Sequence, residues 1–102
     1  MKFGLQKSQI DAINSIFESY TAIVQVILYG SRAKGNYRSG SDIDLTIIET
    51  KLGLSEVLEI ENKLDDLLLP VKIDLSQKRK IDNPDLIEHI NRVGQVFYEK
   101  GS

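Results

Sequence analysis

Two aspartates, Asp42 and Asp44, are the residues of this sequence best suited to chemistry. They stand at the start of an apolar run, residues 42–49, that is typical of a largely buried strand. Side chains at positions i and i+2 of a strand leave the same face. Two carboxylates on one face repel each other unless a cation lies between them, and their hard oxygen atoms select Mg²⁺ or Mn²⁺. The pair therefore predicts a divalent metal site.

A small turn at Gly30 and Ser31 precedes this pair and follows an apolar, β-branched run. Glycine lets backbone approach phosphate oxygens closely. Arg32, Lys34 and Arg38 place three positive charges in the same loop. Such charges are usually solvated, but beside this turn one or more of them can contact a triphosphate. The turn and the carboxylate pair together supply the two halves of a phosphoryl-transfer site.

A third carboxylate, Asp74, is expected to join the pair. Residues 71–75 predict a strand that is linked to residues 42–49 through a helix, which favours a parallel, right-handed crossover. Asp44 is the third residue of its strand and Asp74 is the fourth of its own, so pairing in near register places them side by side. A carboxylate that converges from a distant segment is what a two-cation site requires.

Other readings of these motifs fit less well. The glycine spacing of the turn resembles a P-loop, but Asn36 and Tyr37 stand where Lys and Ser or Thr are needed. The aspartate pair could begin an EF-hand loop, but Ile47 occupies the position that demands glycine. The carboxylates could also simply face solvent on an edge strand. Against this, Ile43 and Leu45 indicate a largely buried strand.

Two further groups are expected to lie outside the chemistry. The basic segment of residues 78–80 is interpreted as a solvated or partner-facing loop. His89, the single histidine, is expected to have a structural or surface role on the last helix.

The bulk properties indicate one α/β domain over residues 1–102. A net charge of −2 disfavours direct binding to nucleic acid, and no apolar run is long enough for a membrane span, so a cytoplasmic protein is expected. Alternating helices and strands predict a mixed sheet of three to four strands packed with helices. The expected helices span residues 9–20, a single turn at 31–34, a segment capped by Ser55 and closed by Pro70, and residues 84–93 capped by Asn83 and followed by Gly94; the expected strands span residues 22–29, 42–49, 71–75 and 95–99.

The stretch from Gly30 to Leu45 resembles the signature of the DNA polymerase β-like nucleotidyltransferases, which is Gly-Ser, ten residues, then Asp-x-Asp. More narrowly, the chain is similar to a minimal nucleotidyltransferase (MNT). The resemblance implies a palm-like nucleotidyltransferase fold. It implies that Gly30 and Ser31 hold the triphosphate and that Asp42 and Asp44 bind two Mg²⁺ or Mn²⁺ ions. It also implies that Asp74 is the third carboxylate, which helps to activate the attacking hydroxyl.

Members of this family often act as antitoxins beside HEPN-domain toxins, and in characterised pairs they adenylylate a tyrosine of the toxin. The resemblance therefore implies transfer of AMP from ATP to a hydroxyl of a HEPN-type partner. A chain of 102 residues offers no second domain to orient an acceptor, which also favours a partner protein in that role. The alternative is a non-catalytic nucleotide-binding module that neutralises a partner by binding alone.

Overall fold

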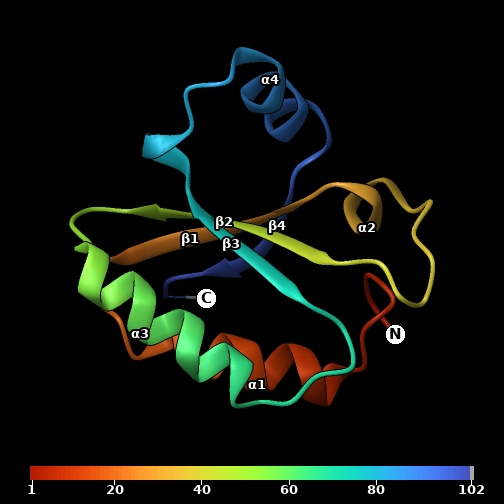
Figure 1. Ribbon diagram of the computed structural model, residues 1–102, viewed down its shortest axis with the longest axis horizontal. Coiled ribbons are helices and arrows are strands. Elements are labelled where there is room, and N and C mark those ends of the chain that lie inside the picture. The colour runs from red at the N-terminus through yellow and green to blue at the C-terminus, as the bar shows by residue number, and fades with distance from the viewer. Residues whose placement is uncertain (102) are drawn as a thin grey trace.

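The computed structural model describes residues 1–101, which form one mixed sheet with helices on both faces (Figure 1). The elements in chain order are α1 (Lys7–Glu18), β1 (Ile23–Tyr29), α2 (Ser31–Lys34), β2 (Ile43–Glu49), α3 (Leu54–Asp65), β3 (Ile73–Gln77), the 3₁₀ turn η1 (Lys78–Lys80), α4 (Pro84–Val93) and β4 (Gln95–Glu99). This arrangement confirms the predicted α/β fold with a small mixed sheet. No helix within residues 1–101 is long and apolar enough to cross a bilayer.

The strand order in the sheet is β3-β2-β1-β4. Strand β1 pairs antiparallel with β2 and with β4, and β2 pairs parallel with β3. The parallel pair is joined through α3, as its crossover connection requires. Because β1 leads directly through the glycine–serine turn toward β2, the end of β1 lies beside the start of β2.

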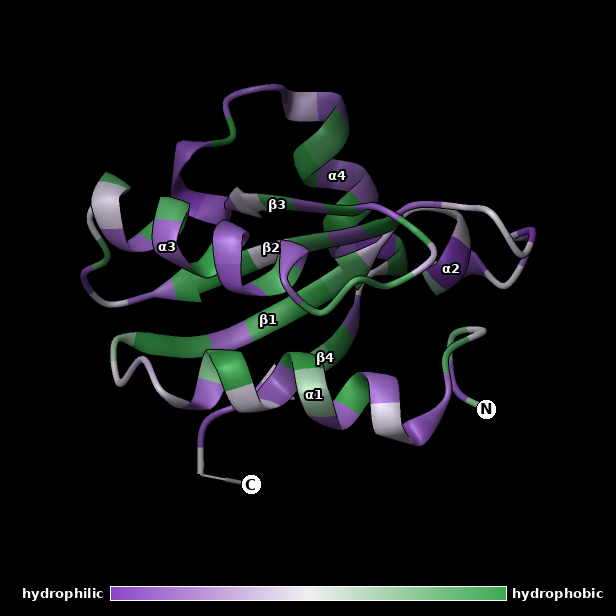
Figure 2. Cartoon of the chain, turned by 60° about the horizontal axis from the view of Figure 1, so that its bottom comes forward, coloured by the Kyte–Doolittle hydropathy of each residue, from purple (hydrophilic) through white to green (hydrophobic). Residues whose placement is uncertain are grey.

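The main core lies between the sheet and the helices α1 and α3, which cover one face (Figures 1 and 2). Strand β2 alternates as a strand should, with Ile43, Leu45 and Ile47 fully buried in this core. In Figure 2, β1 is largely hydrophobic and the two helices carry both polar and apolar stripes. Helix α4 packs against β1 on the opposite face, where the even-numbered side chains of β2 point.

Two helix starts lie two residues before the expected ones. Helix α1 begins at Lys7, ahead of Ser8. The Gln9 side chain accepts a hydrogen bond from the Gln6 backbone N–H at 2.8 Å, so Gln6 and not Ser8 is the capping residue. Helix α3 begins at Leu54, because Glu56 does the same for the Gly53 N–H at 3.1 Å. Glutamine and glutamate that reach back over the first turn thus determine both starts.

The end of α3 and the start of β3 also differ. The helix ends at Asp65, well before Pro70, because the chain turns through Leu68, which is exposed and has a left-handed backbone with φ of 53°. Strand β3 begins at Ile73, two residues later than expected, because pairing with β2 starts there, with Ile43 opposite Ile73.

Helix α4 agrees with the prediction at both ends. The Asn83 side chain accepts hydrogen bonds from the N–H groups of Asp85 (2.9 Å) and Leu86 (3.3 Å), which caps the helix start. Gly94 follows the last helical residue, but its φ is −58°, so the turn does not demand a left-handed residue. Glycine is needed because a Cβ there would overlap the Ile90 carbonyl and lie 2.7 Å from Ile27 Cγ2 of β1.

This contact predicts the effect of one methyl group. Gly94→Ala should lower the free energy of unfolding by about 1–3 kcal/mol, because the added Cβ pushes α4 away from β1. Gly40→Ala is the matched control, since nothing lies within 4 Å of a Cβ at that position, and it should change stability by less than about 0.5 kcal/mol. Urea denaturation measures both. Equal stability of the two variants would contradict the close packing of α4.

Candidate active site

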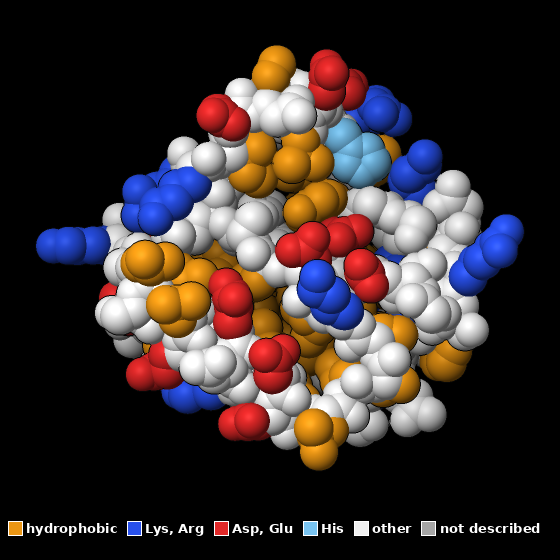
Figure 3. Space-filling model, in the orientation of Figure 1, with side chains coloured by type: hydrophobic (Ala, Val, Ile, Leu, Met, Phe, Trp, Pro, Cys, Tyr) orange, Lys and Arg blue, Asp and Glu red, His pale blue; other side chains and the backbone are white. Residues whose placement is uncertain are grey.

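Two of the three predicted carboxylates, Asp44 and Asp74, lie side by side on the sheet face that α4 only partly covers. Asp44 in β2 pairs directly with Asp74 in β3 and with Tyr29 at the end of β1. Directly paired residues of neighbouring strands point to the same face, so the Asp44 and Asp74 side chains share it. Asp42 immediately precedes β2 and is exposed. Figure 3 shows acidic side chains grouped near the centre of the view, below the histidine.

The local electrostatics reflect this crowding. Partial burial raises the pKa of Asp44 above its ordinary value, and the negative charges of Asp74 and Asp42 raise it further, while His89 opposes the shift. The same two strands affect the neighbouring phenol: burial raises the pKa of Tyr29, with a further contribution from the charges of Asp44 and Asp74. The site therefore concentrates negative charge that a bound cation would neutralise.

The carboxylates have the donor chemistry that a divalent cation needs, but they do not form a closed cage. Within residues 1–101, no three His, Cys, Asp or Glu side chains lie close enough to complete a metal site by themselves. Oxygen donors suit Mg²⁺ or Mn²⁺, and Mg²⁺ sites commonly combine one or two carboxylates with phosphate oxygens and water. In an open site of this kind, Asp44 and Asp74 would bind the cation together with Asp42, and a triphosphate would supply further ligands.

The glycine–serine turn lies directly against these carboxylates. Gly30 has φ of 77° and ψ of −158°, a conformation that is essentially restricted to glycine. A Cβ at Gly30 would overlap Asp44 Oδ2. The Gly30 N–H donates to His89 Nε2 at 3.1 Å, and the half-buried Ser31 begins the short helix α2. The turn therefore needs glycine both for its backbone angles and for the close approach of Asp44.

Arg32 is placed differently from the expected triphosphate contact. Its side chain is only 3% exposed, and its guanidinium donates to the backbone oxygens of Phe3 (2.9 Å) and Ser41 (2.8 Å and 3.1 Å). It also lies over the Tyr37 ring, 5.2 Å from the centroid. Because its donors are directed at the backbone, Arg32 holds the loop and the N-terminal segment together and is not free to bind phosphate.

The remaining positive charges of the loop stay accessible. Lys34 and Arg38 are exposed, and neither side chain forms an ion pair with another residue of the described range 1–101. Of the predicted site residues, the structure brings Gly30, Asp44 and Asp74 together, with Ser31 next to Gly30 in the chain and Asp42 immediately before β2.

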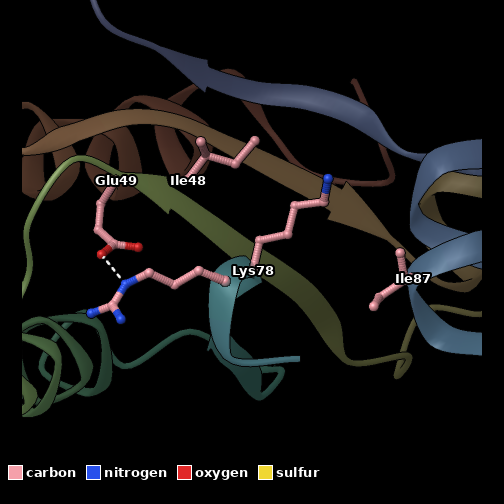
Figure 4. A pocket seen from close by; sticks show the side chains of 5 residues that line it. Ile48, Glu49, Lys78 and Ile87 are labelled. Atoms are coloured by element: carbon pink, nitrogen blue, oxygen red, sulfur yellow. Dashed lines mark hydrogen bonds and ion pairs between the residues drawn. The ribbon is translucent and has the colours of Figure 1, made fainter. Parts of the chain in front are cut away.

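The basic turn η1 borders a hollow on the same face of the sheet, shown in Figure 4. The hollow has a volume of about 360 Å³ and is lined by Ile48, Glu49, Lys78, Arg79 and Ile87. Arg79 binds the buried carboxylate of Glu49 at 2.6 Å, so this part of the basic segment is structural as well as solvated. Ile48 is four residues beyond Asp44, so the hollow begins roughly 13 Å along β2 from the carboxylates.

Two residues lie beside the site although the sequence analysis placed neither of them there. The Tyr29 ring meets the His89 ring edge to face, with centroids 6.2 Å apart. These contacts are consistent with the expected structural role of His89, and they place that role at the turn itself. No sequence signal indicated this, since helix α4 is brought onto β1 only by tertiary packing.

The raised pKa of Asp44 predicts how stability depends on pH when metal is absent. A raised pKa means that the folded state binds the proton more tightly, so this contribution is present at low pH and is lost as pH rises through the folded pKa. Asp44→Asn should therefore be more stable than the native protein at neutral pH in the presence of a chelator. As pH rises above the ordinary Asp pKa of 3.8, the free energy of unfolding should fall less for Asp44→Asn than for the native protein.

Urea denaturation at several pH values measures this decline. Asp65→Asn, which removes an exposed charge on α3, serves as the control and should keep the native pH dependence. Parallel curves for the native protein and Asp44→Asn would contradict the proposed charge crowding.

Comparisons with known proteins agree with this geometry. Two proteins of Methanocaldococcus jannaschii, MJ0126 and MJ1217, are each 36% identical to the chain over 63 residues and carry the provisional name protein adenylyltransferase. The alignment covers 61% of this chain and 63% of each relative, so the chain spans less than two thirds of their length.

Three solved structures share the fold. A chain of a toxin–antitoxin complex crystallised with AMP-PNP has a TM-score of 0.71 at 20% identity, covering 95% of this chain and 76% of its own. A chain of the complex between a tri-AMPylated HEPN toxin of Shewanella oneidensis and its MNT antitoxin has a TM-score of 0.68 at 18% identity, covering 93% and 73%. A minimal nucleotidyltransferase, also provisionally named, has a TM-score of 0.69 at 27% identity, covering 93% and 95%.

The family model for polymerase β nucleotidyltransferases matches residues 11–102, which include the turn and all three carboxylates. Because this match extends over nearly the whole chain, the protein belongs to the polymerase β nucleotidyltransferase family.

Proposed function

We propose that the protein transfers a nucleoside monophosphate, AMP from ATP, to a hydroxyl group of a partner protein. The observation that carries this proposal is the register that sets Asp44 beside Asp74, with the Gly30 turn in contact with Asp44. A phosphate-binding turn next to converging carboxylates is the arrangement that phosphoryl transfer with divalent cations requires. The names of the relatives point to the same reaction.

The roles of the residues follow from their positions. Asp42, Asp44 and Asp74 would hold Mg²⁺ or Mn²⁺, which supplies charge neutralisation at the phosphates. Gly30 and Ser31 would hold the triphosphate.

Lys34 would contribute an accessible positive charge to the triphosphate.

In the reaction the acceptor oxygen forms a bond to the α-phosphorus, the bond to the pyrophosphate oxygen breaks, and pyrophosphate leaves. Asp74, exposed on the edge strand, would take the proton of the attacking hydroxyl.

The partner is inferred from the structural relatives. They include complexes of HEPN toxins with MNT antitoxins, one of which contains an AMPylated toxin, and another complex contains AMP-PNP. We propose that this chain likewise binds a HEPN-type protein as its antitoxin and modifies a tyrosine hydroxyl. The docking surface would be the rim formed by residues 37–41 and Lys78–Lys80, where exposed, charged segments flank the carboxylates.

Intact-mass measurement tests the transfer. The HEPN-type protein that co-purifies with the chain should gain the mass of AMP after incubation with ATP and Mg²⁺. Asp44→Asn should lower the rate by about 100-fold or more, because it removes a charge that positions the cation against the transition state. Asp65→Asn should leave the rate unchanged.

Two outcomes would overturn the enzyme reading. Near-full activity of Asp44→Asn would place the chemistry elsewhere. A partner that binds tightly, loses its own activity and gains no AMP would support the alternative, inhibition by binding alone.

Nucleotide affinity tests the turn separately from the chemistry. Ser31→Ala should weaken ATP binding by about 1.5–3 kcal/mol if its hydroxyl donates to a phosphate oxygen, whereas Ser39→Ala, which changes an exposed loop serine, should not. Gly30→Val should weaken binding more, because its side chain would overlap Asp44. Calorimetry with and without Mg²⁺ measures these affinities. ATP binding that does not depend on Mg²⁺ would argue against the metal site.

A further inference from the structure

His89 connects helix α4 to the turn at the end of β1. Its Nε2 atom accepts a hydrogen bond from the Gly30 backbone N–H at 3.1 Å, and its ring contacts the Tyr29 ring edge to face. Tyr29 and Gly30, which are consecutive in the chain, therefore both contact the same imidazole. The two partners are separated by 59 positions in the chain, so the contact reports the packing of α4 on β1.

The direction of this hydrogen bond specifies the form of the imidazole. Nε2 can accept from an amide only through its lone pair, so this hydrogen bond requires that Nε2 itself carries no proton. A lysine or arginine in its place could not accept. The required property is thus a neutral acceptor at the position of Nε2, which a positive charge at this position would not supply.

The Gly30 amide needs such an acceptor. A buried or partly buried N–H without a partner is costly, and the extended, positive-φ backbone of Gly30 directs its N–H toward α4 and away from the sheet. The acceptor is also held firmly in place. Asn83 caps the start of α4, and Gly94 brings its end into contact with Ile27 of β1. Helix α4 therefore holds the imidazole in a fixed position relative to β1.

We propose that His89 is a positioning residue of the nucleotide site, which fixes the Gly30 turn against Asp44 by accepting a hydrogen bond from the Gly30 amide. The inference rests on the proposed function in that the turn is taken to bind triphosphate. His89 touches neither the phosphates nor the acceptor in this arrangement. Its loss should therefore weaken nucleotide binding and raise KM while changing kcat less.

Four variants separate the acceptor from the packing of the ring. His89→Leu keeps bulk but has no acceptor. His89→Gln can place its side-chain oxygen near the position of Nε2, whereas the shorter side chain of His89→Asn cannot. Asn91→Leu changes an exposed residue of the same helix and is the control.

The affinity for AMP-PNP with Mg²⁺ is measured by calorimetry. His89→Leu and His89→Asn should bind about 5- to 10-fold more weakly, the ratio expected for one lost hydrogen bond. His89→Gln should remain within about twofold of the native protein, and Asn91→Leu should be unchanged. Unaltered binding by His89→Asn would overturn the inference. Equal losses in His89→Gln and His89→Asn would also overturn it, because they would indicate ring packing in place of the acceptor.

Hydrogen exchange of the Gly30 amide, measured without metal or nucleotide, tests the hydrogen bond independently of the proposed function. Exchange should become faster in His89→Asn and stay slow in His89→Gln. If the native protein fails to bind AMP-PNP, the proposed function fails, and the exchange rates still decide whether His89 holds the turn. Slow exchange in both variants would overturn the positioning role.

Discussion

Like-charged carboxylates stay close together only when the surrounding structure prevents them from separating, and this constraint underlies the architecture of the site. Asp44 lies on an interior strand whose other face is fully buried, so it cannot move away without disrupting the core. Asp74 follows because parallel pairing places it directly opposite Asp44. The stability of the core on one face thus maintains an unfavourable concentration of charge on the other.

The two faces of the sheet have different roles, one in the core and one at the site. Helices α1 and α3 cover one face with a continuous apolar core, whereas α4 covers only part of the other and leaves the carboxylates accessible. Strand β2 belongs to both faces, since successive side chains alternate between them. The same seven-residue strand therefore anchors the fold and presents the site.

The loop after β1 is held by contacts that reach across the chain. The Arg32 guanidinium donates to backbone oxygens of the N-terminal segment and of the residue before Asp42, while His89 accepts a hydrogen bond from the Gly30 N–H. A positive charge that could have bound phosphate is thereby used to shape the loop. Lys34 remains as the nearby exposed cation that the proposed function assigns to the triphosphate.

The sequence by itself determined the order of the elements, the mixed sheet and the positions of Asp44 and Asp74, because strand alternation and crossover handedness are local or general rules. Helix ends were less predictable, since Gln9 and Glu56 closed turns earlier than the serines suggested. Only the tertiary structure decided that Arg32 is buried and that His89 meets the turn. Both depend on which distant backbone groups lie within hydrogen-bond reach, and residue type and spacing do not specify such distances.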